Sequence, residues 1–246
     1  MQWQVLDENL AEAFTTRGLI QRNFDWDWKG AEADFIRATN LKPNYALAHI
    51  HYAHLLSVLG RQDEALAEIN KAYLLDPLSE IVLASKFAVL EARGEYDEGI
   101  KKAEQFLSVN PDNTFGKRGL GTFLYHKGEY AKVIEIGEKV LEKATKRKPF
   151  AWLSLVAASY QKTNQLEKAD ALVKELEMQS ETDSKPLYSL AMNYAETNQI
   201  DEAITALEKC FQAHEERMIW LNIEPRFTNL RNDARFKELI QKMKLK

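Results

Sequence analysis

The sequence predicts an all-α fold, a solenoid of about six helical hairpins that ends in a C-terminal capping helix. Two sets of residues recur with a step of 34: Ala31, Ala65 and Gly99, and Pro43, Pro77 and Pro111. The same step returns later in the chain, from Ala169 to Ala203 and from Tyr160 to Tyr194. A repeat of this length, with small residues at fixed positions and a proline at its end, is typical of stacked helix pairs that each pack on their neighbours.

The second repeat shows the two elements of one unit. Helices are predicted over 46–59 and 63–75, because a glycine separates the two stretches and a proline follows the second. Ala65, Ile69 and Ala72 are spaced i, i+4 and i+7. They therefore share the face that is turned toward the first helix of the pair.

The same register divides the rest of the chain into repeats. We expect them at 11–44, 45–79, 80–113, 114–149, 150–183 and 184–217. Four extra residues before Pro149 shift the phase of the array at that point. Residues 1–10, which include Trp3, Val5 and Leu6, look like the end of a helix whose partner is missing. We therefore expect the chain to be the C-terminal part of a longer protein.

The last segment, 218–246, is predicted to cap the array. Its Phe236, Leu239, Ile240 and Met243 follow the i, i+3, i+4, i+7 pattern of a helix that begins near residue 232. A solenoid needs such a cap, because its last hairpin would otherwise expose an apolar face.

Composition excludes several classes of protein. The chain has 246 residues, of which 45% are hydrophobic and 28% charged, and this balance indicates a folded chain. Its net charge of -4 gives no overall attraction for nucleic acid or anionic membranes. One cysteine allows no disulfide within the chain, and no signal peptide or stretch of about 18 apolar residues is present. We expect a cytoplasmic protein.

The 34-residue period, the small-residue positions and the terminal prolines resemble the tetratricopeptide repeat over residues 11–211. Segments 24–32 and 225–236 look like the C-terminal arrays of bacterial multidomain regulators that carry a winged-helix, serine/threonine kinase or nucleotide cyclase domain. The resemblance implies a right-handed solenoid. It also implies a spacing of 12 where Gly18 and Ala31 are 13 apart, so a one-residue bulge is expected in the turn at 24–28.

The resemblance further implies that a partner binds the concave surface built from the first helix of each pair. By register, the residues expected to line this groove are Ile50, His51, His54, Phe115, Arg118, Thr122, Tyr125, Tyr188 and Met192. Aromatic residues and arginine are enriched at the centres of interfaces, so Phe115, Arg118 and Tyr125 are the favoured contacts. The clamp of Lys, Asn and Arg that holds chaperone C-termini in this family is not matched, since Thr15, Leu19, His51, Ile81 and Ser85 occupy its positions.

Other kinds of site are disfavoured. His49, His51 and His54 share one predicted helix, but no pair is four apart and no acidic ligand joins them, so structural or groove histidines are favoured over a metal site. The basic run 143–148 follows a helix C-terminus, where cations are favoured without a phosphate ligand. The basic C-terminal helix reads as a cap rather than a membrane contact.

The sequence holds no glycine-rich phosphate loop, His-Glu-x-x-His run or Gly-x-Ser-x-Gly elbow. We therefore expect that the protein is not an enzyme and that it binds no cofactor or metal. The chain is predicted to be a scaffold that binds a protein or peptide partner, as a module of a bacterial regulator, without binding nucleic acid or membrane. The alternative is a self-associating or sensory domain that forms a homodimer and controls an upstream DNA-binding, kinase or cyclase domain.

Overall fold

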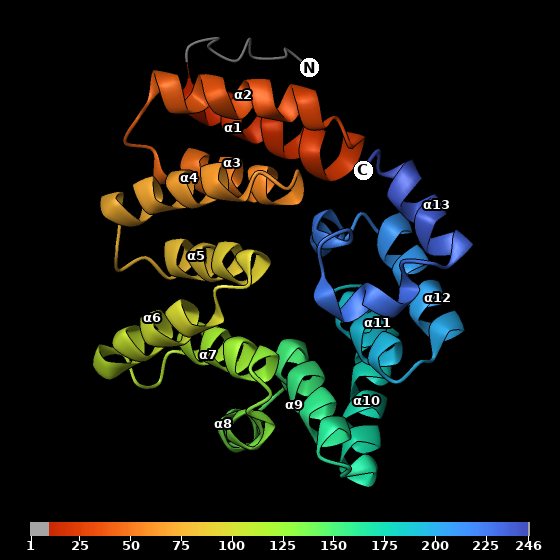
Figure 1. The fold of residues 1–246 in the computed structure, drawn as a ribbon. Coiled ribbons are helices and arrows are strands. Elements are labelled where there is room, and N and C mark those ends of the chain that lie inside the picture. Colours follow the sequence, from red (N-terminus) through yellow and green to blue (C-terminus); the bar gives the residue numbers. More distant parts are fainter. Residues whose placement is uncertain (1–9, 246) are drawn as a thin grey trace. The chain divides into compact units, whose positions relative to one another are not determined.

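The computed structural model describes residues 10–245, and every regular element in that range is a helix (Figure 1). The predicted all-α class is therefore confirmed. The predicted helical tail at 1–10 lies almost wholly outside the described residues. The chain divides into two compact units, one that runs up to Gly94 and includes the residues from Met243, and one that spans Glu95–Lys242. None of the described helices is long and apolar enough to cross a membrane.

Unit 1 contains two complete helix pairs and the first helix of a third. Its elements are α1 (Ala11–Ile20), the π-helical turn η1 (Gln21–Asp25), α2 (Trp28–Leu41), α3 (Ala46–Val58), α4 (Gln62–Leu75) and α5 (Glu80–Arg93). The helices predicted over 46–59 and 63–75 are confirmed to within one residue at each end. Ala65, Ile69 and Ala72 are fully buried, as their spacing predicts.

The expected one-residue bulge is present as the π-helical turn η1 at Gln21–Asp25, which begins three residues before the predicted turn at 24–28 and widens the end of α1. A π turn holds one residue more than an α turn, which accounts for the longer spacing between Gly18 and Ala31. Trp26 follows in the left-handed conformation with φ of 51°. Trp28 is buried, and its indole Nε1 donates a hydrogen bond to the carbonyl oxygen of Met243 at 2.8 Å. The bulge thus seats two tryptophans in the core of unit 1.

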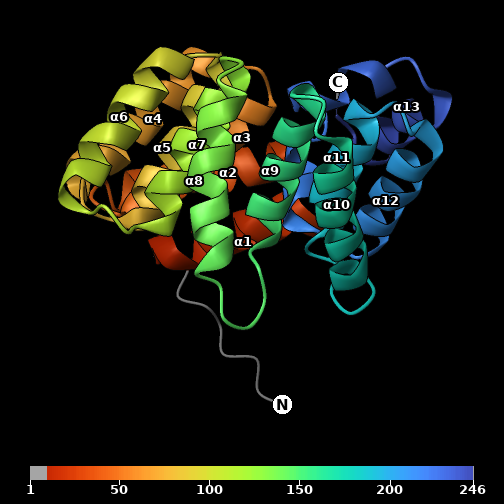
Figure 2. The ribbon, with the colours of Figure 1, turned by 90° about the horizontal axis from the view of Figure 1, so that it is seen from below.

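Unit 2 continues the series of pairs. Its elements are α6 (Tyr96–Val109), α7 (Thr114–His126), α8 (Tyr130–Glu142), α9 (Phe150–Lys162), α10 (Leu166–Ser180), α11 (Leu187–Glu196), α12 (Ile200–Gln212), the 3-10 helices η2 (Glu216–Trp220) and η3 (Pro225–Leu230), and α13 (Ala234–Lys242). Figure 2 shows α9 to α13 beside one another in this unit. Gly99 has no side chain where the ring of Phe123 approaches its backbone, so the small residue of this repeat permits close packing of α6 on α7.

The predicted cap forms, although not with all of its expected residues. Phe236 and Leu239 of α13 are buried, and the helix packs on α12. The placement of Met243 in the same stripe is wrong, because α13 ends at Lys242 and Lys244 takes a left-handed φ of 53°. Met243 is instead fully buried in unit 1, against Trp28.

Candidate binding surface

The first helices of the pairs pack side by side within each unit, and we call the layer they form the A-helix face. In unit 1 it consists of α1, α3 and α5, and in unit 2 of α7, α9 and α11. The predicted groove residues all lie on α3, α7 and α11. Their surroundings differ between the two units, so each unit is described by itself.

In unit 1 the predicted residues pack around a buried arginine. Ile50 is buried, and His51 and His54 are half-buried, so the expectation of exposure is wrong for Ile50. Arg22, from the π-helical turn, is fully buried. Its Nη1 lies 3.4 Å from the carbonyl oxygen of His51, and its Nε donates to the Oδ1 of Asn23 at 2.9 Å.

His51 and His54 are neutral in this environment. Burial, together with the positive charge of Arg22, lowers the pKa of His51 from its ordinary value of 6.5 to about 3. The same two causes, with a contribution from His51, place the pKa of His54 well below its ordinary value. The ring of Phe35 stacks on His51 with the centroids 6.3 Å apart. A half-buried, aromatic and uncharged pair of imidazoles therefore lies on this face.

In unit 2 the predicted groove is already occupied. Tyr125, Tyr188 and Met192 are each less than 10% exposed, so the expectation that they face solvent is wrong. The physical reason is that η3 packs on α11 and lies over the A-helix face. We call residues 216–230, which contain η2 and η3, the η2–η3 segment.

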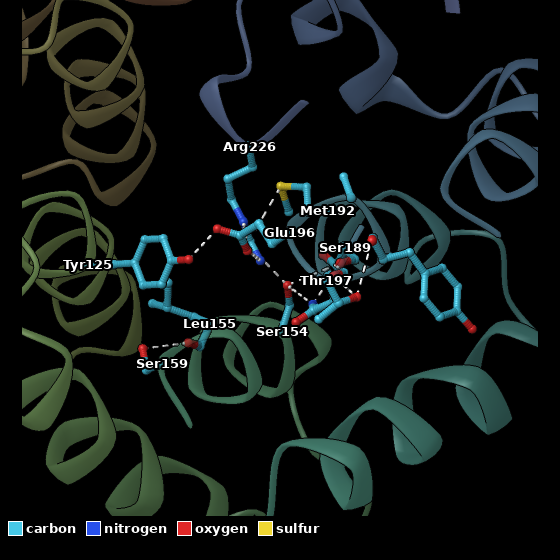
Figure 3. Close-up of polar contacts among 12 residues, drawn as sticks. Tyr125, Ser154, Leu155, Ser159, Ser189, Met192, Glu196, Thr197 and Arg226 are labelled. Atoms are coloured by element: carbon cyan, nitrogen blue, oxygen red, sulfur yellow. Dashed lines mark hydrogen bonds and ion pairs between the residues drawn. The ribbon is translucent and has the colours of Figure 1, made fainter. Parts of the chain in front are cut away.

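Arg226 of the η2–η3 segment is the centre of this contact (Figure 3). Its guanidinium group pairs with the carboxylate of Glu196, with Nε 2.7 Å from Oε2 and Nη2 on the same oxygen. The other carboxylate oxygen, Oε1, accepts the hydroxyl of Tyr125. The Nη1 of Arg226 lies 3.3 Å from the Oγ of Ser154 and 3.8 Å from the Sδ of Met192. The guanidinium carbon also lies 5.4 Å from the centre of the Tyr125 ring.

The charges in this cluster are held in place by burial and by one another. Arg226 and Glu196 have side chains that are only 8% and 10% exposed. Burial disfavours the charged form of Arg226, but Glu196 and its other neighbours outweigh this effect and raise the pKa of the guanidinium group. Burial raises the pKa of Tyr125, and the nearby Glu196 raises it further, so the phenol stays protonated as a donor.

The remaining contacts of the η2–η3 segment lie on α11. Phe227 is fully buried and meets the ring of Tyr188 edge to face, with the centroids 5.3 Å apart. The guanidinium carbon of Arg217 lies 4.5 Å from the centre of the same Tyr188 ring. Asn229 donates from Nδ2 to the carbonyl oxygen of Ala195 at 2.6 Å. The segment therefore contacts α11 through both aromatic and polar groups.

In unit 2, three predicted residues remain exposed or half-buried, and all lie on α7. Phe115 is 44% exposed, and Arg118 is exposed with its guanidinium carbon 5.7 Å from the centre of the Phe115 ring. Thr122, one turn further along the helix, is half-buried. Phe115 and Arg118 form an open aromatic and cationic patch in the first half of α7, and Thr122 borders it.

Arg226 and Glu196, which pair at the polar centre of unit 2, were not predicted as groove residues. Register does place Ser154 among the exposed positions of the groove, but the structure buries it. The signal that could have found Arg226 is the segment Pro225–Phe227, which the sequence comparison with bacterial regulators already singled out. Its contacts lie 30 and 72 residues away along the chain, at Glu196 and Ser154. No helical period connects such distant positions.

The other candidate groups make structural contacts. Both ring nitrogens of the buried His49 are within hydrogen-bond distance of acceptors, Nδ1 at 2.6 Å from the Oε2 of Glu68 and Nε2 at 2.9 Å from the carbonyl oxygen of Pro43. In the basic run, Arg147 pairs with Asp183 at 3.0 Å and Lys148 with Glu175 at 2.8 Å. These cations tie the connection before α9 to the end of α10.

The family model of the tetratricopeptide repeat matches residues 184–215, which contain α11 and α12. Human tetratricopeptide repeat protein 7B is 31% identical over 106 residues, which are 42% of this chain and 12% of that protein. The chain thus spans about one eighth of the length of this relative.

Solved structures share the fold at low identity. A tetratricopeptide repeat protein from Parabacteroides merdae is similar with a TM-score of 0.65 and 16% identity, over 95% of this chain and 84% of that one. The Cut9–Hcn1 hetero-tetramer of APC/C is similar with a TM-score of 0.60 and 15% identity, over 96% and 43% of the two chains. Pseudomonas aeruginosa pilF is similar with a TM-score of 0.58 and 17% identity, over 88% of this chain and 96% of that one. The family model thus matches one repeat of the chain, and the repeat period and the fold of the described residues are similar to those of tetratricopeptide-repeat proteins.

Proposed function

We propose that the chain is a scaffold that binds a protein or peptide partner on its A-helix face. Tetratricopeptide-repeat folds commonly bind protein partners and are generally non-catalytic, which supports a scaffold rather than an enzyme. The observation that carries the proposal is the open patch of Phe115 and Arg118 on α7, bordered by Thr122, because the other predicted contacts in unit 2 are covered by the η2–η3 segment. An exposed aromatic ring beside an arginine is the composition of an interface centre.

The proposal extends to the setting of the chain. The likeness of segments 24–32 and 225–236 to bacterial regulators supports a cytoplasmic module of a larger regulator. The net charge of -4 supports a protein or peptide partner over nucleic acid or an anionic membrane. No metal or cofactor has a part in this function.

The double substitution Phe115→Ala with Arg118→Glu tests the surface. Partners are captured with the purified chain from cells of its source organism after cross-linking, and identified by mass spectrometry. We expect at least a tenfold loss of the captured partner, because the anchor ring is removed and the local charge is reversed. The matched control is Lys209→Glu on α12, an exposed charge reversal away from the A-helix face. Equal capture by a folded double variant would exclude α7 as the contact.

A second candidate function, self-association, is favoured by apolar side chains on the first hairpin. Leu10, Ile20 and Phe24 are 46%, 48% and 52% exposed along α1 and η1. A homodimer through this hairpin would cover them and could set the assembly state of an upstream domain. Light scattering over a concentration series of wild type and of Ile20→Asp checks this. A concentration-dependent dimer that the substitution abolishes supports it, and a monomer at all concentrations removes it.

A further inference from the structure

We propose that the η2–η3 segment occupies, within the same chain, a recognition site on the A-helix face of unit 2, and that a competing partner presents an arginine followed by an aromatic residue. This inference rests on the proposed scaffold function and concerns the second surface of that scaffold.

The η2–η3 segment is built differently from the repeats that it covers. It consists of two short 3-10 helices, whose i to i+3 hydrogen bonds have poorer geometry than those of an α-helix. The hydrogen bonds that tie it to the A helices run from its side chains, namely Arg226 to Glu196 and Ser154, Arg217 to the Oγ of Ser189 at 3.0 Å, and Asn229 to Ala195. The segment therefore contacts α9 and α11 as a bound peptide would, through individual side chains of a short irregular stretch, and not as a further pair of α-helices.

The acceptors around Arg226 are arranged for a guanidinium group. The Oε2 of Glu196 lies against Nε and Nη2 of Arg226, while its Oε1 accepts a hydrogen bond from the hydroxyl of Tyr125. Ser154 donates its hydroxyl to the carbonyl oxygen of Ser189 at 3.2 Å, so its lone pairs remain to accept from Arg226 and from the Nδ2 of Asn193. A planar fork of donors satisfies these acceptors together, whereas the compact ammonium of lysine does not.

The buried carboxylate of Glu196 also disfavours an uncharged ligand. Its side chain is 10% exposed, so a ligand that displaces Arg226 without a cation of its own leaves a carboxylate buried and unpaired. An uncompensated buried charge is strongly unfavourable. Any occupant of this face must therefore bring a positive charge to the same place, and the adjacent edge-to-face contact of Phe227 with Tyr188 selects an aromatic residue after it.

The covalent tether decides how the site can be tested. Arg226 follows the end of α12 at Gln212 by 14 residues, so the segment is present at a high effective concentration and excludes a free peptide. A free peptide gains access only when the tethered contact is weakened. The probe is a fluorescent peptide with the sequence of residues 222–231, and a second peptide carries alanine in place of the arginine at position 226.

We expect the double variant Arg226→Ala with Phe227→Ala to bind the arginine-containing peptide at least tenfold more tightly than wild type, measured by fluorescence anisotropy. The alanine peptide should bind at least tenfold more weakly to this variant, and adding Glu196→Gln should weaken the arginine peptide by a similar factor. The matched control is Arg231→Ala, an exposed arginine just after the segment, which should behave as wild type. A folded double variant that binds neither peptide, or both equally, overturns the inference.

A second measurement covers the case in which the double variant does not fold. Hydrogen exchange of wild type should show the amides of residues 226–230 exchanging at least ten times faster than those in the middle of α11, because the segment opens without the repeats. Equal exchange rates would show one cooperative unit and overturn the inference. Neither failure affects the α7 patch, whose test uses Phe115 and Arg118, so the two proposals fail separately.

Discussion

Both units bury an arginine against their A-helix face, but the neighbours of the two guanidinium groups differ. Arg22 of unit 1 lies beside His51 and His54, whose protonated forms are suppressed. Arg226 of unit 2 lies on the carboxylate of Glu196 and the ring of Tyr125. The A-helix face of unit 1 thus holds its buried arginine beside two neutral histidines, whereas that of unit 2 holds its buried arginine beside a charged glutamate.

The comparison shows that burial alone does not define a binding site on such a scaffold. In unit 1 the arginine comes from the helix pair itself, through the π-helical turn η1. In unit 2 it comes from outside the pairs, on a segment laid over the face. A cation supplied by a separate segment can be supplied by another chain, whereas one built into a hairpin cannot.

The largest expected effect is in unit 2, from Glu196→Gln. The substitution keeps the shape of the side chain but leaves Arg226 buried without its charge partner, which costs about 3–5 kcal/mol of unfolding free energy. Urea denaturation followed by circular dichroism measures the loss. The matched control is Glu208→Gln, an exposed carboxyl on α12, for which a change within about 0.5 kcal/mol is expected. A loss below about 1 kcal/mol for Glu196→Gln would mean that Arg226 finds other compensation.

The next largest effect is in unit 1, where the free energy of unfolding depends on pH through His51. Because the pKa of His51 falls from 6.5 to about 3 on folding, the unfolded chain binds more protons between these values, and stability is lost as pH falls below 6.5. From His51 alone the loss between pH 7 and pH 5 is about 2 kcal/mol. The His51→Gln variant should therefore lose about 2 kcal/mol less unfolding free energy than wild type between pH 7 and pH 5, measured by urea denaturation.

The control for His51 is His214→Asn, because His214 is an exposed histidine and asparagine tolerates its left-handed φ of 48°. The contribution of His51 is the difference in pH dependence between His51→Gln and this variant. If His51→Gln and wild type lose equal stability on acidification, His51 is protonated in the folded chain and the description of unit 1 is wrong.

The smallest expected effect sharpens the description of unit 2. Tyr125→Phe removes the hydroxyl that donates to Glu196 but keeps the ring beside Arg226, so a loss of about 1 kcal/mol is expected. Tyr130→Phe on α8 is the matched control, since its ring contacts Tyr125 at 5.3 Å while the substitution leaves that contact in place. If neither variant loses measurable stability, the hydroxyl of Tyr125 contributes nothing and only its ring matters.

The fold could be predicted in some detail from the residues alone. The step of 34, the paired small residues and the breakers between helices placed α3 and α4 to within one residue at each end, and the extra residue after Gly18 predicted the bulge that the structure realises as η1. These features depend on contacts between residues a few positions apart or one repeat apart. A regular period determines such contacts without knowledge of the rest of the chain.

The candidate site could be predicted only in part. Register placed His51, Phe115, Arg118, Tyr125 and Tyr188 on the first helices of their pairs, as the structure has them, but it did not reveal which of them another segment covers. Arg118 stays exposed while Tyr188 is fully buried, although the two hold equivalent positions in their repeats, 15 residues before Val133 and Ala203.

The sequence by itself therefore determined the class of fold, the helix pairs and the layer on which a partner is expected to bind. Tertiary structure alone decided that Arg226 lies on Glu196 and Tyr125, that Phe227 covers Tyr188, and that Met243 lies against Trp28 rather than in the cap. These contacts join residues that are 30 to 215 positions apart and follow no repeat. Their formation depends on the three-dimensional path of an irregular C-terminal segment, which no local pattern of side chains specifies.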